Sequence, residues 1–247
     1  MIEVRRLSKA FRGLQALSDV SFTARDGEIT GLIGPNGAGK TTSLRILYTV
    51  LRADTGAARV DGFDAATQAR EVQRRIGVLP DARGLYPRLT AREHIRYFGR
   101  LHGLPADELE TRCDDLIDRL GMADIADRRA RGFSRGQSLK VALARALVHR
   151  PRNLILDEPT NGLDIGAGRA VRRLIAELRD AGHCILLSSH IMAEVDALCD
   201  RLVVIADGRV VASGTPDELR RRTGHAALED VFLQSIGGPE AGLGSAA

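Results

Sequence analysis

The residues with the clearest chemical meaning form one glycine-rich run, Gly34-Pro35-Asn36-Gly37-Ala38-Gly39-Lys40-Thr41-Thr42. An apolar segment at 28–33 precedes it and an amphipathic segment at about 39–51 follows, so we expect the run to join a strand to a helix. Glycines let such a loop wrap around phosphate oxygens, while backbone N–H groups at the helix start point at the anion. The pattern G-x-x-x-x-G-K-[ST] therefore predicts a site for a nucleoside triphosphate.

Two side chains of this run have distinct expected roles. Lys40 is predicted to reach the β- and γ-phosphates, and the hydroxyl of Thr41 to hold Mg²⁺. The lysine is informative because the chain otherwise uses arginine: among 36 basic residues, only Lys9, Lys40 and Lys140 are lysines. A compact ammonium group suits a phosphate site in a way that a planar guanidinium does not duplicate.

Two adjacent carboxylates follow a second apolar run, with a strand predicted at 154–156. That strand would place Asp157 and Glu158 at its carboxyl end, the edge at which doubly wound sheets bind their ligands. Neighbouring side chains of a strand point to opposite faces, so we expect Asp157 to orient Mg²⁺ while Glu158 polarises the attacking water. Pro159 and Gly162 are expected to turn the chain into a loop.

Strand-like and helical segments alternate along the chain, which predicts an α/β fold with a mostly parallel sheet. Further strands are expected at 76–79, 184–188 and 202–205, with an antiparallel one at 209–212 after the Asp207-Gly208 turn. The segment 88–150 contains no convincing strand, and helices are expected there at 92–101, 107–120 and 137–148. We therefore expect one domain with a core at about 1–87 and 151–236, a helical insertion at about 88–150, and a frayed tail at about 237–247.

A third run, Phe133-Ser134-Arg135-Gly136-Gln137, directly precedes the last of these helices. Here the chain resembles the ABC ATPase family, whose signature reads Leu-Ser-Gly-Gly-Gln before a helix; Phe133 and Arg135 depart from it. Ser134 can cap the helix, and Gly136 lets its backbone approach an anion. The resemblance implies a head-to-tail dimer in which Ser134, Gly136 and Gln137 close over the partner's phosphate loop.

The resemblance covers about residues 2–236 and implies a P-loop NTPase core, a small antiparallel β region, and ATP and Mg²⁺ as cofactors. Asn161-Gly162-Leu163-Asp164 resembles the family's D-loop, where the aspartate lies at the dimer seam. His190, after Ser188-Ser189, matches the switch histidine that contacts the γ-phosphate. Phe11 stands where the family places an aromatic ring on adenine; simple packing at a strand end is the alternative.

One position departs from the family pattern at a metal ligand. The family usually carries glutamine after the strand at 76–79, and this chain has Asp81. Glutamine ligates Mg²⁺ through a neutral carbonyl, whereas Asp81 would bring a charged carboxylate to the same place. The alternative is that Asp81 contacts a membrane partner.

Composition and local resemblances bound the function. A net charge of +4 is too small to indicate nucleic acid as a partner, and the apolar runs are too short for a membrane helix. The start of the chain lacks the pattern of a signal peptide, and the three cysteines are expected to be reduced and buried. We therefore expect a cytoplasmic subunit that reaches the inner face of the membrane through a permease.

Two functional classes remain open for such a chain. The segment 84–90 resembles the part that receives the membrane subunit, and the segment 228–233 resembles the end of exporter subunits that serve drugs, sodium ions or polysaccharide. These features favour an ATP-driven exporter over an ABC ATPase that acts on a soluble macromolecule. A small-molecule kinase would need an arginine-bearing lid and has no use for the signature helix.

Overall fold

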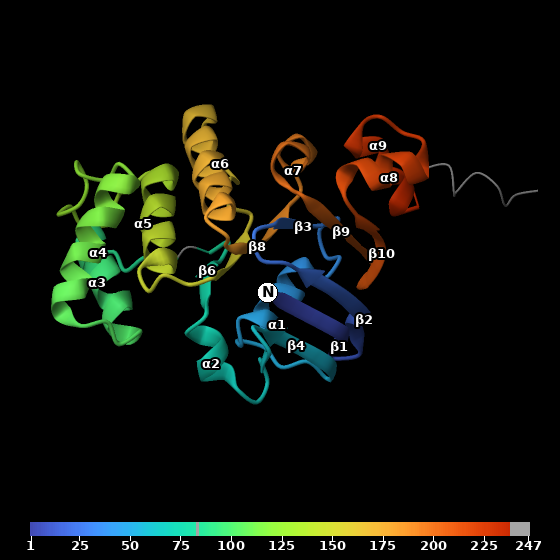
Figure 1. The fold of residues 1–247 in the computed structure, drawn as a ribbon, viewed down its shortest axis with the longest axis horizontal. Helices are drawn as coiled ribbons and strands as arrows, with labels where there is room; N and C mark the ends of the chain where they lie inside the picture. Colours follow the sequence, from blue (N-terminus) through green and yellow to red (C-terminus); the bar gives the residue numbers. More distant parts are fainter. Residues whose placement is uncertain (83, 238–247) are drawn as a thin grey trace, which may run out of the picture.

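The computed structural model of the chain describes residues 1–82 and 84–237, and within them the strands form two sheets (Figure 1). The larger sheet has the order β10-β9-β3-β8-β7-β6. Its parallel strands are β3 (Ile29–Ile33), β6 (Ile76–Leu79), β7 (Asn153–Asp157), β8 (Cys184–Ser189) and β9 (Arg201–Ala206). β10 (Arg209–Gly214) pairs antiparallel with β9, so the predicted parallel sheet with an antiparallel edge is confirmed.

The smaller sheet is antiparallel and is built mainly from the beginning of the chain. Its order is β2 (Leu14–Ala24), β1 (Ile2–Phe11), β4 (Thr55–Val60) and β5 (Phe63–Asp64). Ile2, Val4 and Leu7 of β1 are buried, which fixes one face of this sheet against the protein interior. The small antiparallel β region that the family resemblance implies is thus present.

The phosphate-loop segment opens α1 (Lys40–Leu47), and α2 (Ala69–Gln73) leads into β6. The helix predicted to run to residue 51 ends four residues earlier. The Tyr48 N–H still bonds to the Leu44 carbonyl, but Thr49 adopts a positive φ of 68°. A β-branched residue in that conformation cannot continue a right-handed helix.

The helical insertion separates β6 from β7 and contains α3 (Ala91–Leu101), α4 (Ala106–Arg119) and α5 (Arg135–Leu147). These three helices confirm the three predicted ones, although α5 begins two residues before the expected start. Thr90 and Glu93 form a capping box that fixes the start of α3. Figure 1 shows the three helices side by side at one end of the molecule.

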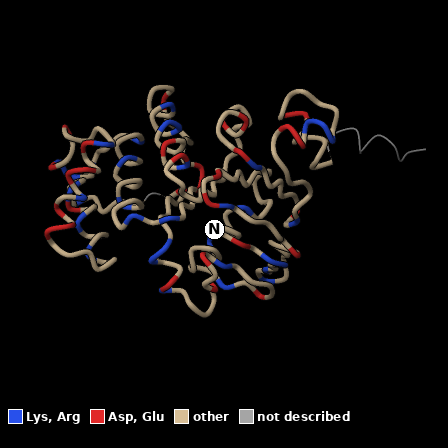
Figure 2. Tube along the Cα trace, viewed as in Figure 1, with Lys and Arg blue, Asp and Glu red and all other residues tan. Residues whose placement is uncertain are grey.

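Four helices after residue 150 were not placed by sequence analysis: α6 (Ile165–Asp180), α7 (Met192–Leu198), α8 (Pro216–Thr223) and α9 (Leu228–Ser235). The three cysteines are unpaired and buried, as expected. Apart from Gly237, the predicted tail lies outside the described residues. Figure 2 shows acidic and basic residues interspersed on both the helical and the strand-rich parts.

Two hydrophobic cores lie on opposite faces of the larger sheet. Leu154 and Leu156 of β7 pack with residues of α3, α4 and α5, whereas Ile155 packs with residues of α1 and the smaller sheet. This alternation is the period-2 pattern of a strand buried on both faces. The sheet is thereby held from both sides, and the carboxyl ends of β3, β7 and β8 form a rigid platform for the loops that follow them.

Candidate functional site

The glycine-rich loop leaves the fully buried strand β3 and is held tightly against the end of β9. A Cβ on Gly34 would come within 2.1 Å of the Ile205 carbonyl oxygen, so only glycine fits there. Gly39, the residue before α1, has a φ of 105°, a conformation that favours glycine. The loop conformation therefore depends on glycines at positions that the pattern requires.

Lys40 begins α1 and folds back along this loop. Its ammonium group is buried and donates to the carbonyl oxygens of Gly34 at 2.6 Å and Pro35 at 3.2 Å. Burial lowers the pKa of Lys40, and the nearby charges of Glu158 and Asp157 act in the opposite direction. The position suits a point charge that contacts an anion bound in the loop.

The two carboxylates are fixed by a serine on the neighbouring strand. Ser188 Oγ donates to Asp157 Oδ1 at 2.5 Å and accepts from the Glu158 N–H at 3.0 Å. β7 ends at Asp157, and Glu158 leaves the strand with a φ of 50°. The alternation of side chains along a strand therefore does not apply to Glu158, and both carboxylates line the same cavity.

His190 follows β8 and contacts Glu158 directly, with Nδ1 2.8 Å from Oε2. An ionised carboxylate only accepts hydrogen bonds, so the imidazole Nδ1–H is the donor. This leaves Nε2 as the ring nitrogen available to another group. The pair joins the ends of two adjacent parallel strands, β7 and β8.

A cavity of about 470 Å³ gathers these groups. It is lined by Asn36, Gly37, Ala38, Gly39, Lys40, Thr41, Thr42, Asp81, Asp157, Glu158, Asn161 and His190. Thr41, Asp81 and Asp157 offer the hydroxyl and carboxylate oxygens that Mg²⁺ prefers. Such a cavity can hold a triphosphate, a metal ion and a water molecule beside a carboxylate.

The other expected site residues do not line this cavity. Ser134 and Gln137 form a capping box at the start of α5, with Ser134 Oγ accepting from the Gln137 N–H at 3.1 Å. Asp164 caps α6 through the Ala167 N–H at 2.8 Å. The ring of Phe11 is exposed, with Lys9 Nζ 5.5 Å from its centroid. The capping function predicted for Ser134 is therefore present, and Gly136 lies beside it in the first turn.

Sequence analysis did not assign a role to Ser188 or Asn161. Ser188 pairs in register with Asp157 across the β7–β8 ladder, which is why its hydroxyl reaches the carboxylate. The sequence signal for Ser188 is a polar residue at the end of one predicted strand, when the neighbouring strand ends in an acidic residue. Asn161 lines the cavity because the loop after Glu158 folds back over it.

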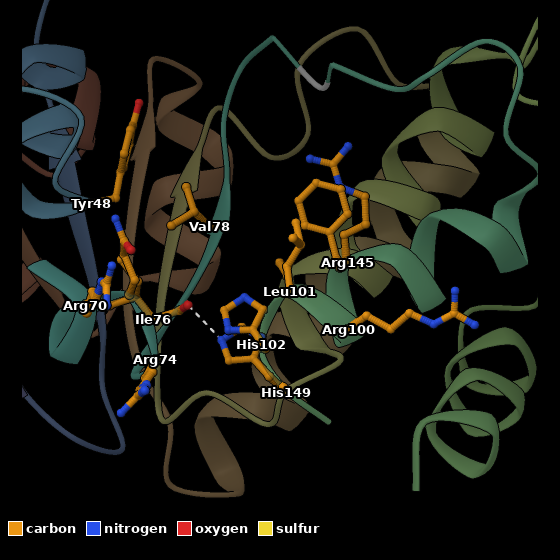
Figure 3. Close-up of a pocket in the computed structure, with 14 residues that line it drawn as sticks. Tyr48, Arg70, Arg74, Ile76, Val78, Arg100, Leu101, His102, Arg145 and His149 are labelled. Atoms are coloured by element: carbon orange, nitrogen blue, oxygen red, sulfur yellow. Dashed lines mark hydrogen bonds between the residues drawn. The ribbon is translucent and has the colours of Figure 1, made fainter. Parts of the chain in front are cut away.

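A larger cavity, of about 630 Å³, lies between the helical insertion and β6 (Figure 3). In it the rings of His102 and His149 stack at a centroid distance of 3.6 Å, and His149 Nε2 lies 2.9 Å from the Ile76 carbonyl oxygen. Its walls carry Arg70, Arg74, Arg100 and Arg145. None of the phosphate-loop residues lines it, so it is separate from the site above.

Comparison with known proteins defines the class of this molecule. The profile of the ABC transporter family matches residues 17–161, and the chain belongs to that family. It is an ATP-binding cassette with ATPase activity. No helix among the described residues is long and apolar enough to cross a membrane.

Individual relatives cover nearly the whole chain. The ABC transporter ATP-binding protein NatA of Bacillus subtilis is 44% identical over 233 residues, which are 94% of this chain and 95% of NatA. The daunorubicin resistance ATP-binding protein DrrA3 of Streptomyces coeruleorubidus is 38% identical over 96% of this chain and 74% of its own length. A solved ATP-binding subunit of an ABC transporter superposes with a TM-score of 0.89 and 33% identity, over 95% of this chain and 99% of that subunit.

Proposed function

We propose that this ATPase hydrolyses Mg²⁺-ATP as a head-to-tail dimer and drives export through a separate membrane subunit. One observation supports this most directly. Lys40, Asp157, Glu158 and His190 line one cavity, while the capped start of α5 lies outside it. The start of α5 can bind an anion but does not line the cavity of its own subunit. We therefore infer that it contacts the triphosphate bound in the cavity of a second copy.

Within one subunit, the phosphate loop and Lys40 bind the triphosphate. Thr41, Asp157 and Asp81 line the cavity and would hold Mg²⁺ through their hydroxyl and carboxylate oxygens. Glu158 accepts from His190 and faces the cavity, where it polarises the water that attacks the γ-phosphate. Phe11 is our candidate for the ring that stacks on adenine, because it is an exposed aromatic residue at the end of β1.

The dimer completes the site by adding donors from the second subunit. Ser134, Gly136 and Gln137 would contact the γ-phosphate bound by the partner, with Asp164 at the seam between the two copies. The anion would then be neutralised from two sides in a site closed to water, where hydrogen bonds are strong. Hydrolysis removes the shared γ-phosphate, so the dimer opens, and a membrane subunit converts that motion into transport.

The partner surface that we propose lies near Tyr86. Tyr86 and Tyr97 are exposed and enclose an apolar hollow with Pro87, Arg88 and Leu89, in the segment that resembles a docking site for a membrane subunit. Exposed apolar patches of this kind mark interaction sites. This contact would hold the protein on the cytoplasmic face of the membrane. The similarity to NatA and to a drug-resistance subunit supports export rather than import.

Mixing two inactive subunits tests the shared site. Lys40→Ala removes the triphosphate contact, and Ser134→Arg blocks the start of α5. In a mixed dimer, one composite site carries both lesions and the other carries neither, so ATPase activity should return. A mixture that stays inactive, with both variants folded and able to associate, argues against sharing. An ATP-dependent crosslink between Ser134→Cys and Asn36→Cys of another copy would then decide the matter.

A further inference from the structure

Arg135 occupies the signature position at which the ABC family has glycine, and its side chain lies over a loop of the same subunit. It is the first residue of α5. A Cβ on Gly162 would come within 2.3 Å of Arg135 Nη1 and within 3.3 Å of its Cδ and Cζ. The bare Cα of Gly162 therefore provides the space in which the guanidinium lies.

The loop that Arg135 contacts carries the proposed water-polarising carboxylate at its other end. The Asn161 N–H donates to the Glu158 carbonyl at 3.2 Å, and the Leu163 N–H donates to the Thr160 carbonyl at 3.2 Å. Asp164 then anchors the loop to the start of α6. These consecutive hydrogen-bonded turns restrain the backbone between Glu158 and Gly162. We therefore expect a displacement of the backbone at Gly162 to displace Glu158 as well.

Arg135 is also close to the nucleotide cavity of its own subunit. A hollow of about 360 Å³ is lined by Asp81, Phe133, Arg135, Ser138 and Asn161. Asp81 and Asn161 line the phosphate-loop cavity as well, so the two hollows share these residues as a common wall. The start of α5 and the catalytic cavity of one subunit are thus adjacent.

We propose that Arg135 is a positioning residue for Glu158 of the same subunit: through its contact with Gly162 it ties the start of α5 to the loop 158–164. This inference rests on the proposed function, in which the start of α5 meets the ATP of the partner. Arg135 then links the ATP held by one site to the geometry of the carboxylate at the other. A glycine at position 135 has no side chain to make this link.

A double-mutant cycle between Arg135→Ala and Gly162→Ala tests the contact. Gly162 has a φ of 71°, so alanine strains the backbone there even without a neighbour. Gly182→Ala is the matched control, because Gly182 has a φ of 90° and an added Cβ would meet open space. The measured quantities are kcat and KM for ATP, the affinity for a fluorescent ATP analogue, and the melting temperature.

Arg135→Ala should lower kcat by roughly tenfold or more, because a small misplacement of a catalytic group has effects of that size. The affinity for the ATP analogue and the melting temperature should stay near those of the parent. Arg135→Lys, which keeps the long stem and the charge, should recover part of the activity. In the parent, Gly162→Ala should lower kcat much more than Gly182→Ala does. In the Arg135→Ala background, the two glycine substitutions should lower kcat by similar factors.

Three results would overturn the inference. The first is additive effects of Arg135→Ala and Gly162→Ala on kcat. The second is a parallel loss of melting temperature and ATP affinity in Arg135→Ala, which indicates a general structural role. The third is a kcat in Arg135→Gly equal to that of the parent. The head-to-tail dimer is tested separately by mixed subunits that keep Arg135, so either idea can fail without the other.

Discussion

His190 Nδ1 and Glu158 Oε2 lie 2.8 Å apart at the carboxyl ends of two neighbouring parallel strands. The imidazole N–H holds the carboxylate toward the cavity that also contains Lys40. A carboxylate has several lone pairs, so the hydrogen bond from the imidazole leaves Glu158 able to accept another from a water molecule. In the mechanism that we propose, Glu158 is the base and His190 is the group that orients it.

Glu158→Gln should keep ATP binding and lose turnover by about a hundredfold to ten-thousandfold, because an amide cannot polarise the attacking water. Steady-state phosphate release measures turnover, and size-exclusion chromatography with ATP should show an accumulated dimer. Parental turnover in this variant would remove Glu158 from the mechanism and leave His190 as the leading candidate.

Lys40→Ala should abolish ATP binding, because charge-assisted contacts to the phosphates carry much of the affinity. Titration with a fluorescent ATP analogue and Mg²⁺ measures the loss. Lys140→Ala is the matched control. Lys140 donates to the Gly121 carbonyl at the surface and does not line the cavity. Equal affinities in the two variants would contradict the phosphate-loop assignment.

Ser188→Ala removes the hydroxyl that holds both Asp157 and the Glu158 N–H. Ser188 is fully buried, so the Asp157 carboxylate loses a buried donor, while the Glu158 N–H keeps the Ser188 carbonyl oxygen as an acceptor. The free energy of unfolding should fall by about 1–3 kcal/mol, with a drop in kcat. Urea unfolding and ATPase assays measure the two effects; an unchanged kcat would show that the serine serves stability alone.

Asp81 can be tested as a Mg²⁺ ligand by titrating the metal. Asp81→Ala should raise the Mg²⁺ concentration needed for half-maximal ATPase activity by roughly tenfold. Asp81→Gln restores the residue usual in the family and should return the requirement toward that of the parent. An unchanged Mg²⁺ requirement in Asp81→Ala would favour the alternative, a contact with the membrane partner.

The environment of His149 should make part of the free energy of unfolding sensitive to acid. Burial, with a smaller contribution from the adjacent His102, lowers the pKa of His149 to about 4. The unfolded chain therefore takes up this proton first as the pH falls below about 6.5. The free energy of unfolding should decrease by up to about 3 kcal/mol between about pH 6.5 and about pH 4.

Urea unfolding across that pH range measures this decrease. His149→Gln should remove most of the part that comes from this residue. His225→Gln is the control, because it makes the same chemical change at an exposed histidine. A pH dependence that is the same in His149→Gln and the parent would show that other groups cause it.

The sequence predicted the phosphate loop, the parallel strands and the three inserted helices because each has strong local signals. The first two strands, β1 and β2, were not placed by sequence analysis. β1 has shifts in register, and Arg6 on β1 and Asp19 on β2 have positive φ values of 46° and 57°, so the alternation of apolar and polar residues is broken.

Contacts between distant residues were beyond prediction for a different reason. Nothing local links Ser188 to Asp157, or Arg135 to Gly162, because these pairs meet only after the sheet and the insertion are assembled. The register of β7 against β8 decides the first contact. The path of the loop after Glu158 decides the second.

The side chains of β7 alternate between two hydrophobic cores, with Leu154 in one and Ile155 in the other, so the larger sheet separates the two cores. Within the two cores, a change of side-chain volume among α3, α4 and α5 reaches the residues packed around α1 through the strands of the larger sheet, whereas Arg135 at the start of α5 contacts the loop 158–164 directly. The helical side can therefore be remodelled while the packing around α1 is preserved. In a family of such subunits, the core behind the helical insertion can change its side-chain volumes while the core beside the phosphate loop keeps its own.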